Sequence, residues 1–305
     1  MRLAAIDIGS NTFLLTIIDQ VAGARPPCII LDEVRYVRLQ AGLDSQGNFS
    51  LDALNRAQRV LEEFAELIKQ HRVDRVKGVA TSATRQAGNG HEIVRLAGKL
   101  GIPVEIISGE REANLTFSGA HFFQSVSETH WVVDVGGGST EVILGQGEQI
   151  TWKHSFPLGC VRLYQQWGRD ILGLRQHIRE QFDSVVPLAL RRGQSVLAIA
   201  VAGTAVELVR LYFGNSFDLE RAEGFVFDRS QLNQVMDVLM HHSPHQLVRN
   251  FGVPESRADV LLHGGLVLDE FFNTIGLQFL KISRSGIRFG VLRELLNESG
   301  SKDSE

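Results

Sequence analysis

The sequence predicts an α/β protein of two domains, and three observations lead to this prediction. At 305 residues, the chain is long enough for two domains of ordinary size. Short apolar stretches of strand length alternate with segments in which apolar residues recur at helical spacing, and this alternation indicates sheets covered by helices. Residues 5–14, AIDIGSNTFL, resemble residues 132–141, VVDVGGGSTE, so one strand–turn–strand pattern occurs twice.

The first half of the chain opens with this pattern and continues with alternating strands and helices. Ser50 predicts the start of a helix because apolar residues recur at helical spacing from Leu51 to Ile68. The expected strands are 3–8, 13–18, 30–39, 76–81 and 103–108. Further helices are expected near 90–100 and 110–122. The polar stretch 125–130 is the expected linker.

The second half repeats the order, which sets the expected domain boundaries. Its expected strands are 131–135, 140–144, 149–154, 196–201 and 277–283. Its expected helices are one around 171–191, one after residue 201, several within 228–275, and a closing helix. Asp7 and Asp134 are 134 − 7 = 127 residues apart, about the length of one domain. We therefore expect domains at 1–124 and 125–305, with a cleft between them and a final helix that can pack back on the first.

Composition and charge exclude several classes of protein. The net charge is −4, without the basic excess expected of a duplex nucleic-acid binder. The two cysteines, Cys28 and Cys160, argue against a disulfide framework and favour a reducing compartment. The N-terminus lacks the apolar core of a signal peptide, and no apolar run is long enough to span a bilayer. We expect a cytoplasmic protein with no nucleic-acid or membrane partner.

The two turns have the composition of a phosphate-binding site. Glycine lets a ligand approach the backbone closely, and successive N–H groups in such a turn form a concavity that binds anions. Neighbouring hydroxyl and amide side chains add donors. A single copy would fit an ordinary hairpin, but two copies one domain apart favour phosphate binding. The expected phosphate-binding residues are Gly9, Ser10, Asn11 and Thr12 in the first turn, and Gly136, Gly137, Gly138, Ser139 and Thr140 in the second.

The aspartate before each turn indicates a metal ion. A carboxylate beside a phosphate is repulsive unless a hard cation lies between them, and Mg²⁺ binds one or two carboxylates together with phosphate oxygens. We expect Mg²⁺ or Mn²⁺, with Asp134, Asp7 and Glu141 as candidate ligands. Glu141 is the weaker candidate, because it follows the turn and also fits an exposed strand position.

Seven stretches together resemble the exopolyphosphatase/guanosine pentaphosphate phosphohydrolase (Ppx/GppA) family. They are AAIDIGSNTFLL (4–15), GVATSATRQAGN (78–89), VEIISGEREANLTFSGA (104–120), VVDVGGGSTEVILG (132–145), FPLGCVRL (156–163), VAGTAVEL (201–208) and ISRSGIRFGVL (282–292). The resemblance implies two actin-like ATPase (ribonuclease H-like) domains. It also implies release of terminal phosphate from inorganic polyphosphate or guanosine pentaphosphate. Guanosine tetraphosphate is a further expected ligand, and a homodimer is compatible with the family.

The resemblance also assigns residues that composition alone would leave unassigned. Glutamates favour the first turn of any helix because they complement its dipole, but Glu112 matches the family's catalytic base. Arg85, expected in a loop after a buried strand, matches an arginine that neutralises charge on the transferred phosphate. Gly203 and Thr204 match a third turn that contacts phosphate or nucleotide; on their own they would fit a plain strand-to-helix turn.

Four positions depart from the family pattern and leave substrate preference open. They are Leu14, Asn114, Glu223 and Phe289. Because these departures reduce the polar surroundings of the expected site, one alternative is a regulatory protein that binds guanosine alarmones and has vestigial hydrolysis. Another is an ATP-dependent kinase, since the same fold supports kinases.

Overall fold

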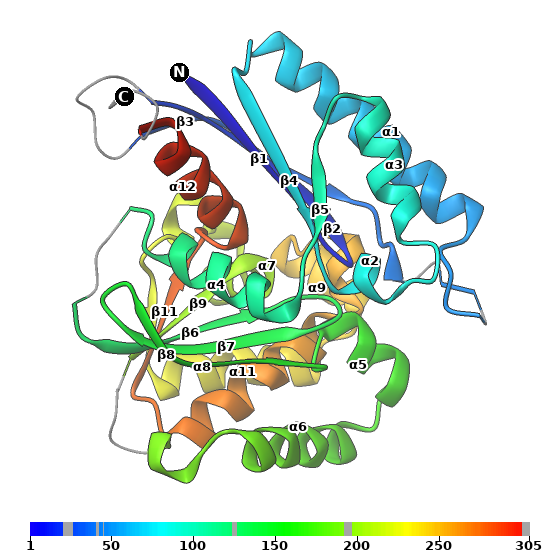
Figure 1. Cartoon of the computed structure of the whole chain (residues 1–305). Coiled ribbons are helices and arrows are strands. Elements are labelled where there is room, and N and C mark those ends of the chain that lie inside the picture. Colours follow the sequence, from blue (N-terminus) through cyan, green and yellow to red (C-terminus); the bar gives the residue numbers. More distant parts are fainter. Residues whose placement is uncertain (21–26, 41–42, 45, 124–126, 192–196, 301–305) are drawn as a thin grey trace. The chain divides into compact units, whose positions relative to one another are not determined.

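The computed structural model describes residues 1–20, 27–40, 43–44, 46–123, 127–191 and 197–300 (Figure 1). The chain divides into two compact units. The first comprises Met1–Gln124 and the C-terminal segment from Ser285, and the second comprises Ser125–Arg284. The predicted second domain, 125–305, thus differs from the structure at its end, because residues from Ser285 onward belong to the first unit.

The first unit is built on a five-stranded sheet in the order β3-β2-β1-β4-β5. β1 pairs antiparallel with β2 and parallel with β4. At the two edges of the sheet, β3 pairs antiparallel with β2, and β5 pairs parallel with β4. The strands are β1 Arg2–Ile8, β2 Thr12–Asp19, β3 Cys28–Tyr36, β4 Arg75–Ala80 and β5 Val104–Ile106. The helices are α1 Leu51–Gln70, α2 Ser82–Gln86, α3 His91–Lys99, α4 Gly109–Ala120 and α12 Ile287–Gly300. Ser50 caps α1 as predicted, accepting a hydrogen bond from the backbone N–H of Ala53.

The two faces of this sheet have separate apolar cores. Ala4, Ile6 and Ile8 share a core with α1 and α3, whereas Leu3 and Ala5 share one with α4 and α12. Side chains alternate along a strand, so Asp7 lies on the α4 and α12 face.

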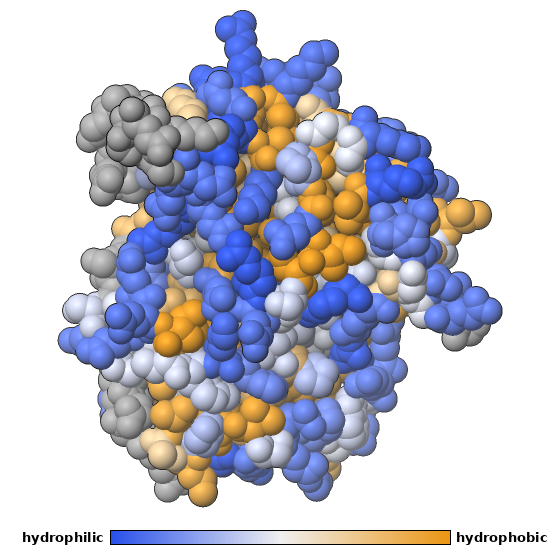
Figure 2. Space-filling model, viewed as in Figure 1, coloured by the Kyte–Doolittle hydropathy of each residue, from blue (hydrophilic) through white to orange (hydrophobic). Residues whose placement is uncertain are grey.

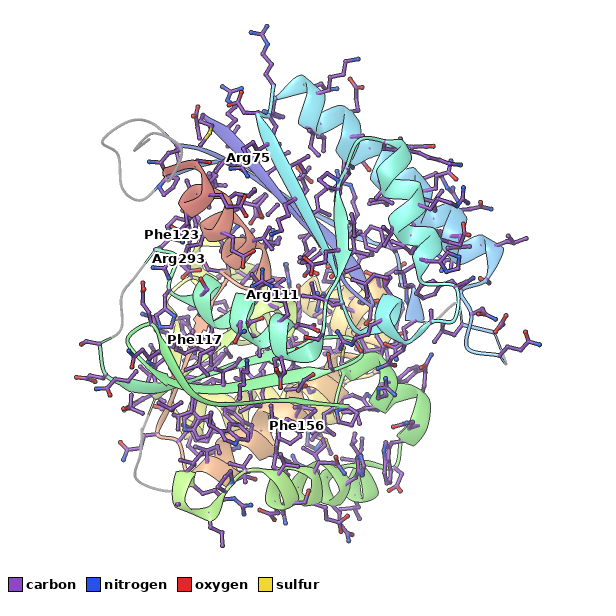
Figure 3. All side chains as sticks on the ribbon, in the orientation of Figure 1. Arg75, Arg111, Phe117, Phe123, Phe156 and Arg293 are labelled. Carbon is purple, nitrogen blue, oxygen red and sulfur yellow. The ribbon has the colours of Figure 1, made fainter. Side chains whose placement is uncertain are left out.

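Glycines allow α4 and α12 to pack with their backbones in contact. A Cβ on Gly119 would lie 2.0 Å from the carbonyl oxygen of Gly286, and one on Gly290 would lie 2.0 Å from that of Leu115. Arg75 of β4 fixes the other end of α12, donating to Leu295 O at 3.2 Å and Ser299 Oγ at 2.8 Å (Figure 3). α12 is therefore an integral part of the first unit.

The second unit contains a six-stranded sheet in the order β10-β11-β9-β6-β7-β8. Its strands are β6 Thr129–Val135, β7 Thr140–Gln146, β8 Gln149–Phe156, β9 Leu197–Val201, β10 Val226–Phe227 and β11 Phe279–Ser283. Its α-helices are α5 Cys160–Trp167, α6 Ile171–Val185, α7 Ala202–Phe213, α8 Arg229–His241, α9 Pro244–Phe251, α10 Glu255–Ala258 and α11 Leu261–Ile275. Single 3₁₀ turns lie at Leu188–Leu190, Gly214–Ser216 and Glu220–Ala222. One large apolar core, which includes Trp131, Phe156, Phe182 and Phe271, joins this sheet to its helices.

Five strands of the second sheet, β8-β7-β6-β9-β11, repeat the topology of the first, and β10 is added at the edge. This repeat confirms the predicted α/β fold with a repeated ribonuclease H-like, actin-like domain. β6 pairs antiparallel with β7 and parallel with β9, as β1 pairs with β2 and β4. The register is also shared, since Asp7 lies opposite Leu14 and Asp134 lies opposite Glu141. The 127-residue repeat in the sequence is therefore a structural repeat.

Some elements differ from the sequence-based expectations. The predicted helix at 171–191 ends at Val185. Three elements were not predicted from the sequence, namely α2, α5 and the two-residue strand β10. These elements are too short for hydrophobic periodicity to show. Part of the predicted linker, 125–126, and the first residue of the predicted strand 196–201 lie outside the described residues, while β6 begins at Thr129.

On the face seen in Figure 2, hydrophilic residues are interspersed with hydrophobic ones. Each helix in the described part of the chain is too short or too polar to cross a membrane.

Candidate active site

The first turn joins β1 to β2 and is held by its own backbone and by the segment after β3. Gly9 N donates to Thr12 O at 3.0 Å. Ser10 O accepts from Gln40 N at 3.1 Å, and Asn11 O accepts from the N–H groups of Val37 and Arg38 at 3.0 and 2.9 Å. Ser10, Asn11 and Thr12 are buried. The turn is thus fixed before any ligand binds.

The second turn, between β6 and β7, repeats this arrangement. Gly136 N donates to Ser139 O at 3.0 Å, and both positions are displaced from the first turn by 127 residues (136 − 9 and 139 − 12). Gly136 O accepts from Cys160 N at 2.9 Å, and Gly137 O accepts from Val161 N at 3.0 Å. The residues that hold this turn follow β8, just as those that hold the first turn follow β3.

These contacts direct amide groups of the second turn outward. In a trans peptide the C=O of one residue and the N–H of the next point in opposite directions. Since the carbonyls of Gly136 and Gly137 point at the start of α5, the N–H groups of Gly137 and Gly138 point away from it. Within the described chain, neither N–H donates a hydrogen bond. Such an arrangement of amides can bind an anion.

Glu112 lies in the first turn of α4, which Ser108 caps by accepting from Arg111 N at 3.2 Å. Glu112 is 7% exposed, and its Oε2 accepts from Arg85 Nη1 at 3.0 Å. Burial raises the pKa of Glu112 to about 6, and the nearby charge of Arg85 opposes this rise. Glu112 is thus a buried carboxylate that is mostly ionised near neutral pH.

Arg85 belongs to the short helix α2, and not to a loop as predicted from the sequence. The same Nη1 that contacts Glu112 also donates to Ile107 O at 2.7 Å. Arg85 therefore orients the Glu112 carboxylate, and its predicted role towards phosphate remains a prediction.

Asp7 lies at the end of β1, close enough to Glu112 for their charges to interact. Burial is the main cause that raises the pKa of Asp7 to about 7; the charge of Glu112 raises it further, and Arg288 of α12 lowers it. Its neighbours on the adjacent strands, Leu14 and Val79, carry no charge. Asp7 Oδ1 is buried and has no hydrogen-bond partner among the described residues. A buried carboxylate oxygen without a donor suits a metal ion or a metal-bound water.

The acids of the second unit are also buried. Asp134 is 9% exposed at the end of β6, and Glu141 is 1% exposed, so the alternative of an exposed strand position does not apply to Glu141. Glu141 Oε1 accepts from Ser155 Oγ at 2.6 Å. In the part of the chain that the structure describes, no group of three or more His, Cys, Asp or Glu side chains could by itself hold a metal ion.

Two predicted phosphate ligands already use their hydroxyl protons within the second unit. Thr140 Oγ1 donates to Leu158 O at 2.8 Å, and Thr204 Oγ1 donates to Val135 O at 2.9 Å. These side chains are therefore not free donors, which differs from the expectation for Thr140. The bond from Thr204 does place the third turn beside the second hairpin.

The third turn has two features that the sequence did not reveal. Ala202 has a φ of 65°, a left-handed conformation that is uncommon for a residue with a side chain and occurs often at functional sites. A Cβ on Gly203 would lie 2.0 Å from Nη2 of Arg257, so the guanidinium packs directly on this glycine. The motif at 201–208 did not predict Arg257, because this arginine lies more than fifty residues after Gly203 in the chain.

The departures from the family pattern have structural roles at two positions. Glu223 accepts from Ser283 Oγ at 2.9 Å and from Arg284 N at 2.7 Å, in the second unit. Phe289 is buried in the first unit, with its ring centroid 5.2 Å from that of Phe122. Leu14 faces Asp7 across β1 and β2.

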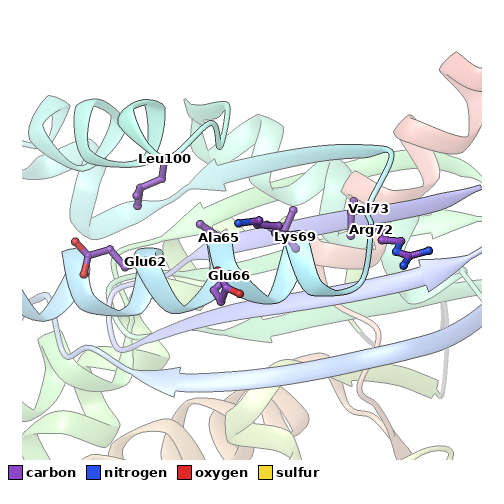
Figure 4. Close-up of a pocket in the computed structure, with 8 residues that line it drawn as sticks. Glu62, Ala65, Glu66, Lys69, Arg72, Val73 and Leu100 are labelled. Carbon is purple, nitrogen blue, oxygen red and sulfur yellow. The ribbon is translucent and has the colours of Figure 1, made fainter.

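A surface pocket of about 560 Å³ runs along α1 in the first unit (Figure 4). Its lining residues are Glu62, Ala65, Glu66, Ile68, Lys69, Arg72, Val73 and Leu100. None of the predicted site residues contributes to this lining, so the pocket is separate from Asp7 and Glu112.

Comparison with known proteins identifies the family. The profile of the Ppx/GppA phosphatase family matches residues 16–299. The structure of the Aquifex aeolicus member of that family is 29% identical, with a TM-score of 0.81 over 98% of each chain. An exopolyphosphatase from Cytophaga hutchinsonii is 27% identical, with a TM-score of 0.87 over 98% of each chain. The chain therefore belongs to the Ppx/GppA phosphatase family.

Proposed function

We propose that the protein is a hydrolase of phosphoanhydrides that releases terminal phosphate from inorganic polyphosphate or from guanosine pentaphosphate. The observation that carries this proposal is the buried Glu112 carboxylate, oriented by Arg85 and with a pKa of about 6. A general base works best when its pKa lies near the operating pH. The exopolyphosphatase from Cytophaga hutchinsonii supports polyphosphate as one substrate.

In the proposed reaction Glu112 takes a proton from the attacking water. Arg85 contacts Oε2, and Oε1 accepts no hydrogen bond within the described chain, so this second oxygen is available to a water. The water oxygen bonds to the terminal phosphorus, the bond to the bridging oxygen breaks, and the shortened chain leaves as an anion. The turns at 9–12 and 136–140 would bind phosphate groups through their amides.

The buried carboxylates at the ends of β1 and β6 are suitable ligands for a divalent cation. The partnerless Oδ1 of Asp7 is a hard oxygen ligand, and Mg²⁺ needs only one or two carboxylates when phosphate oxygens and water complete its shell. We propose that Asp7 at the end of β1 or Asp134 at the end of β6 holds Mg²⁺ or Mn²⁺. When bound, the ion would neutralise phosphate charge.

A phosphate-release assay with Mg²⁺ tests the proposal and resolves the substrate. Long polyphosphate, guanosine pentaphosphate and ATP are compared at equal concentrations of terminal phosphate. We expect release from one or both of the first two at a rate well above that from ATP. Release from ATP alone, or from none of the three, would contradict the proposal.

The expected pH dependence of kcat/KM follows from the pKa of Glu112. Only the ionised form accepts a proton, so kcat/KM should fall on the acid side with a midpoint near pH 6. Without burial, a glutamate would place this midpoint near its ordinary value of 4.5. The measurement is kcat/KM between pH 4.5 and 9 at saturating Mg²⁺. A midpoint below pH 5 would contradict the raised pKa of Glu112.

A further inference from the structure

Arg162 holds two successive carbonyl groups of the second turn. It belongs to α5, and its backbone N–H donates to Gly137 O at 3.1 Å. Its side-chain Nε donates to Gly138 O at 2.9 Å. One residue thus fixes two adjacent peptide groups, one through its main chain and one through its side chain.

This double contact determines where the next amides point. Because each peptide is trans, a carbonyl held by Arg162 sends the following N–H to the opposite side. The carbonyl of Gly138 thereby directs the N–H of Ser139, and the carbonyls of Gly136 and Gly137 direct those of Gly137 and Gly138. Without the Nε contact, the peptide between Gly138 and Ser139 would have no such restraint. Three consecutive outward N–H groups form the anion-binding concavity.

The second turn needs this restraint more than the first. Glycine has the greatest backbone freedom of any residue, and the second turn has three glycines in succession where the first has Gly9 alone. Both turns are followed, after two further strands, by a Val-Arg-Leu triplet, at 37–39 and 161–163. In both triplets the N–H groups of valine and arginine donate to one turn carbonyl, of Asn11 or of Gly137. The Nε contact of Arg162 supplements this shared backbone arrangement.

We propose that Arg162 is a positioning residue that pre-forms the turn at 136–139 for a phosphate group of the substrate. It acts by holding the Gly138 carbonyl, in addition to contributing positive charge. A turn ordered in advance binds more tightly because less conformational entropy is lost on binding. The identity of the ligand as a phosphate chain rests on the proposed function.

The test compares Arg162→Met and Arg162→Lys with a matched control. Arg210 is also partly buried in the second unit, and it donates to Glu207 Oε2 at 2.7 Å on α7. Arg210→Met therefore removes a partly buried cation that pairs with a carboxylate of α7 and not with a carbonyl of the turn. In Arg162→Met we expect KM for polyphosphate to rise about tenfold while kcat changes by less than about threefold. Arg162→Lys keeps the charge but not the planar Nε donor, so its KM should lie close to that of Arg162→Met.

A binding measurement separates this inference from the proposed function. Calorimetric titration with inorganic tripolyphosphate uses Glu112→Gln as the background, alone and combined with Arg162→Met or Arg210→Met. We expect the Arg162 change to weaken binding about tenfold and the Arg210 change to leave it unaltered.

Each remaining outcome decides one or both of the claims. If the unmodified protein hydrolyses polyphosphate but Arg162→Met matches Arg210→Met, the inference is wrong and the proposed function stands. A lysine variant with unaltered KM would show that charge alone suffices, which also overturns the inference. If no substrate is hydrolysed, the proposed function fails, and tripolyphosphate binding that depends on Arg162 still supports the inference. If no substrate is hydrolysed and tripolyphosphate binds to none of the variants, both claims are overturned.

Discussion

Replacing Glu112 with glutamine should lower the rate of phosphate release by about 10²- to 10⁴-fold, the range contributed by a general base. Glutamine has nearly the same shape and can still accept the hydrogen bond from Arg85, so the site should keep its geometry. Because the loss concerns proton transfer, kcat should fall while KM for polyphosphate changes little. Steady-state kinetics at pH 7.5 with Mg²⁺ measures both.

The same substitution should stabilise the protein. The pKa of Glu112 rises from its ordinary value of 4.5 to about 6 in the folded state, so burying the ionised carboxylate costs free energy of folding. This cost is absent below about pH 4.5, grows between pH 4.5 and 6, and is fully present above pH 6, where it amounts to about 2 kcal/mol. Glu112→Gln removes the cost, so Tm should rise at pH 7.5 and remain unaltered at pH 4.5.

Glu110 provides the matched control. It lies in the same first turn of α4 but is exposed. Glu110→Gln should keep both the rate and the stability of the unmodified protein. Equal activities for Glu112→Gln and the unmodified protein would remove the catalytic assignment, whatever the effect on Tm.

Replacing Arg175 with methionine should cost about 3 kcal/mol of stability, which is typical of breaking a buried ion pair. Arg175 Nη1 lies 2.6 Å from Asp269 Oδ2 and 2.6 Å from Glu270 Oε1. The two carboxylates are only 2% and 0% exposed. Removing their shared cation leaves buried negative charge with less compensation, although Arg179 and Arg229 still contact these acids. Thermal unfolding should show Tm lowered by about 10 °C for a unit of this size.

A surface ion pair gives the comparison for this prediction. Arg221 Nε contacts Asp218 Oδ2 at 2.9 Å, and the two side chains are 48% and 56% exposed. Asp218→Asn should cost less than about 1 kcal/mol, because water screens an exposed pair. Similar losses of Tm in the two variants would show that the buried network contributes no more than a surface contact.

Much of the fold could be predicted because local sequence patterns determine it. The aspartate-turn pattern at residues 7 and 134 predicted two hairpins one domain apart, and the sheets confirm both in the same register. Short apolar stretches identified every strand except β10, and Ser50 with the helical spacing after it identified α1.

What the sequence could not show depends on contacts between distant residues. The final helix was expected to be able to pack on the first domain, but its backbone contact with α4 at Gly119, Gly286 and Gly290 is one that no local pattern reveals. The hydroxyl of Thr140 fits a phosphate ligand by type, but the carbonyl of Leu158 already accepts its proton. Arg162 could have been found, since the Val-Arg-Leu triplet is repeated at 37–39 and 161–163.

The most direct test of the account follows the oxygen of the attacking water. The protein is incubated with polyphosphate and Mg²⁺ in water enriched in ¹⁸O, and the released phosphate is analysed by mass spectrometry. Hydrolysis assisted by Glu112 predicts one ¹⁸O atom in each phosphate released, and formation of this labelled phosphate that is about 10²- to 10⁴-fold slower in Glu112→Gln. Phosphate without ¹⁸O, or labelled phosphate formed equally fast by Glu112→Gln, would contradict the account.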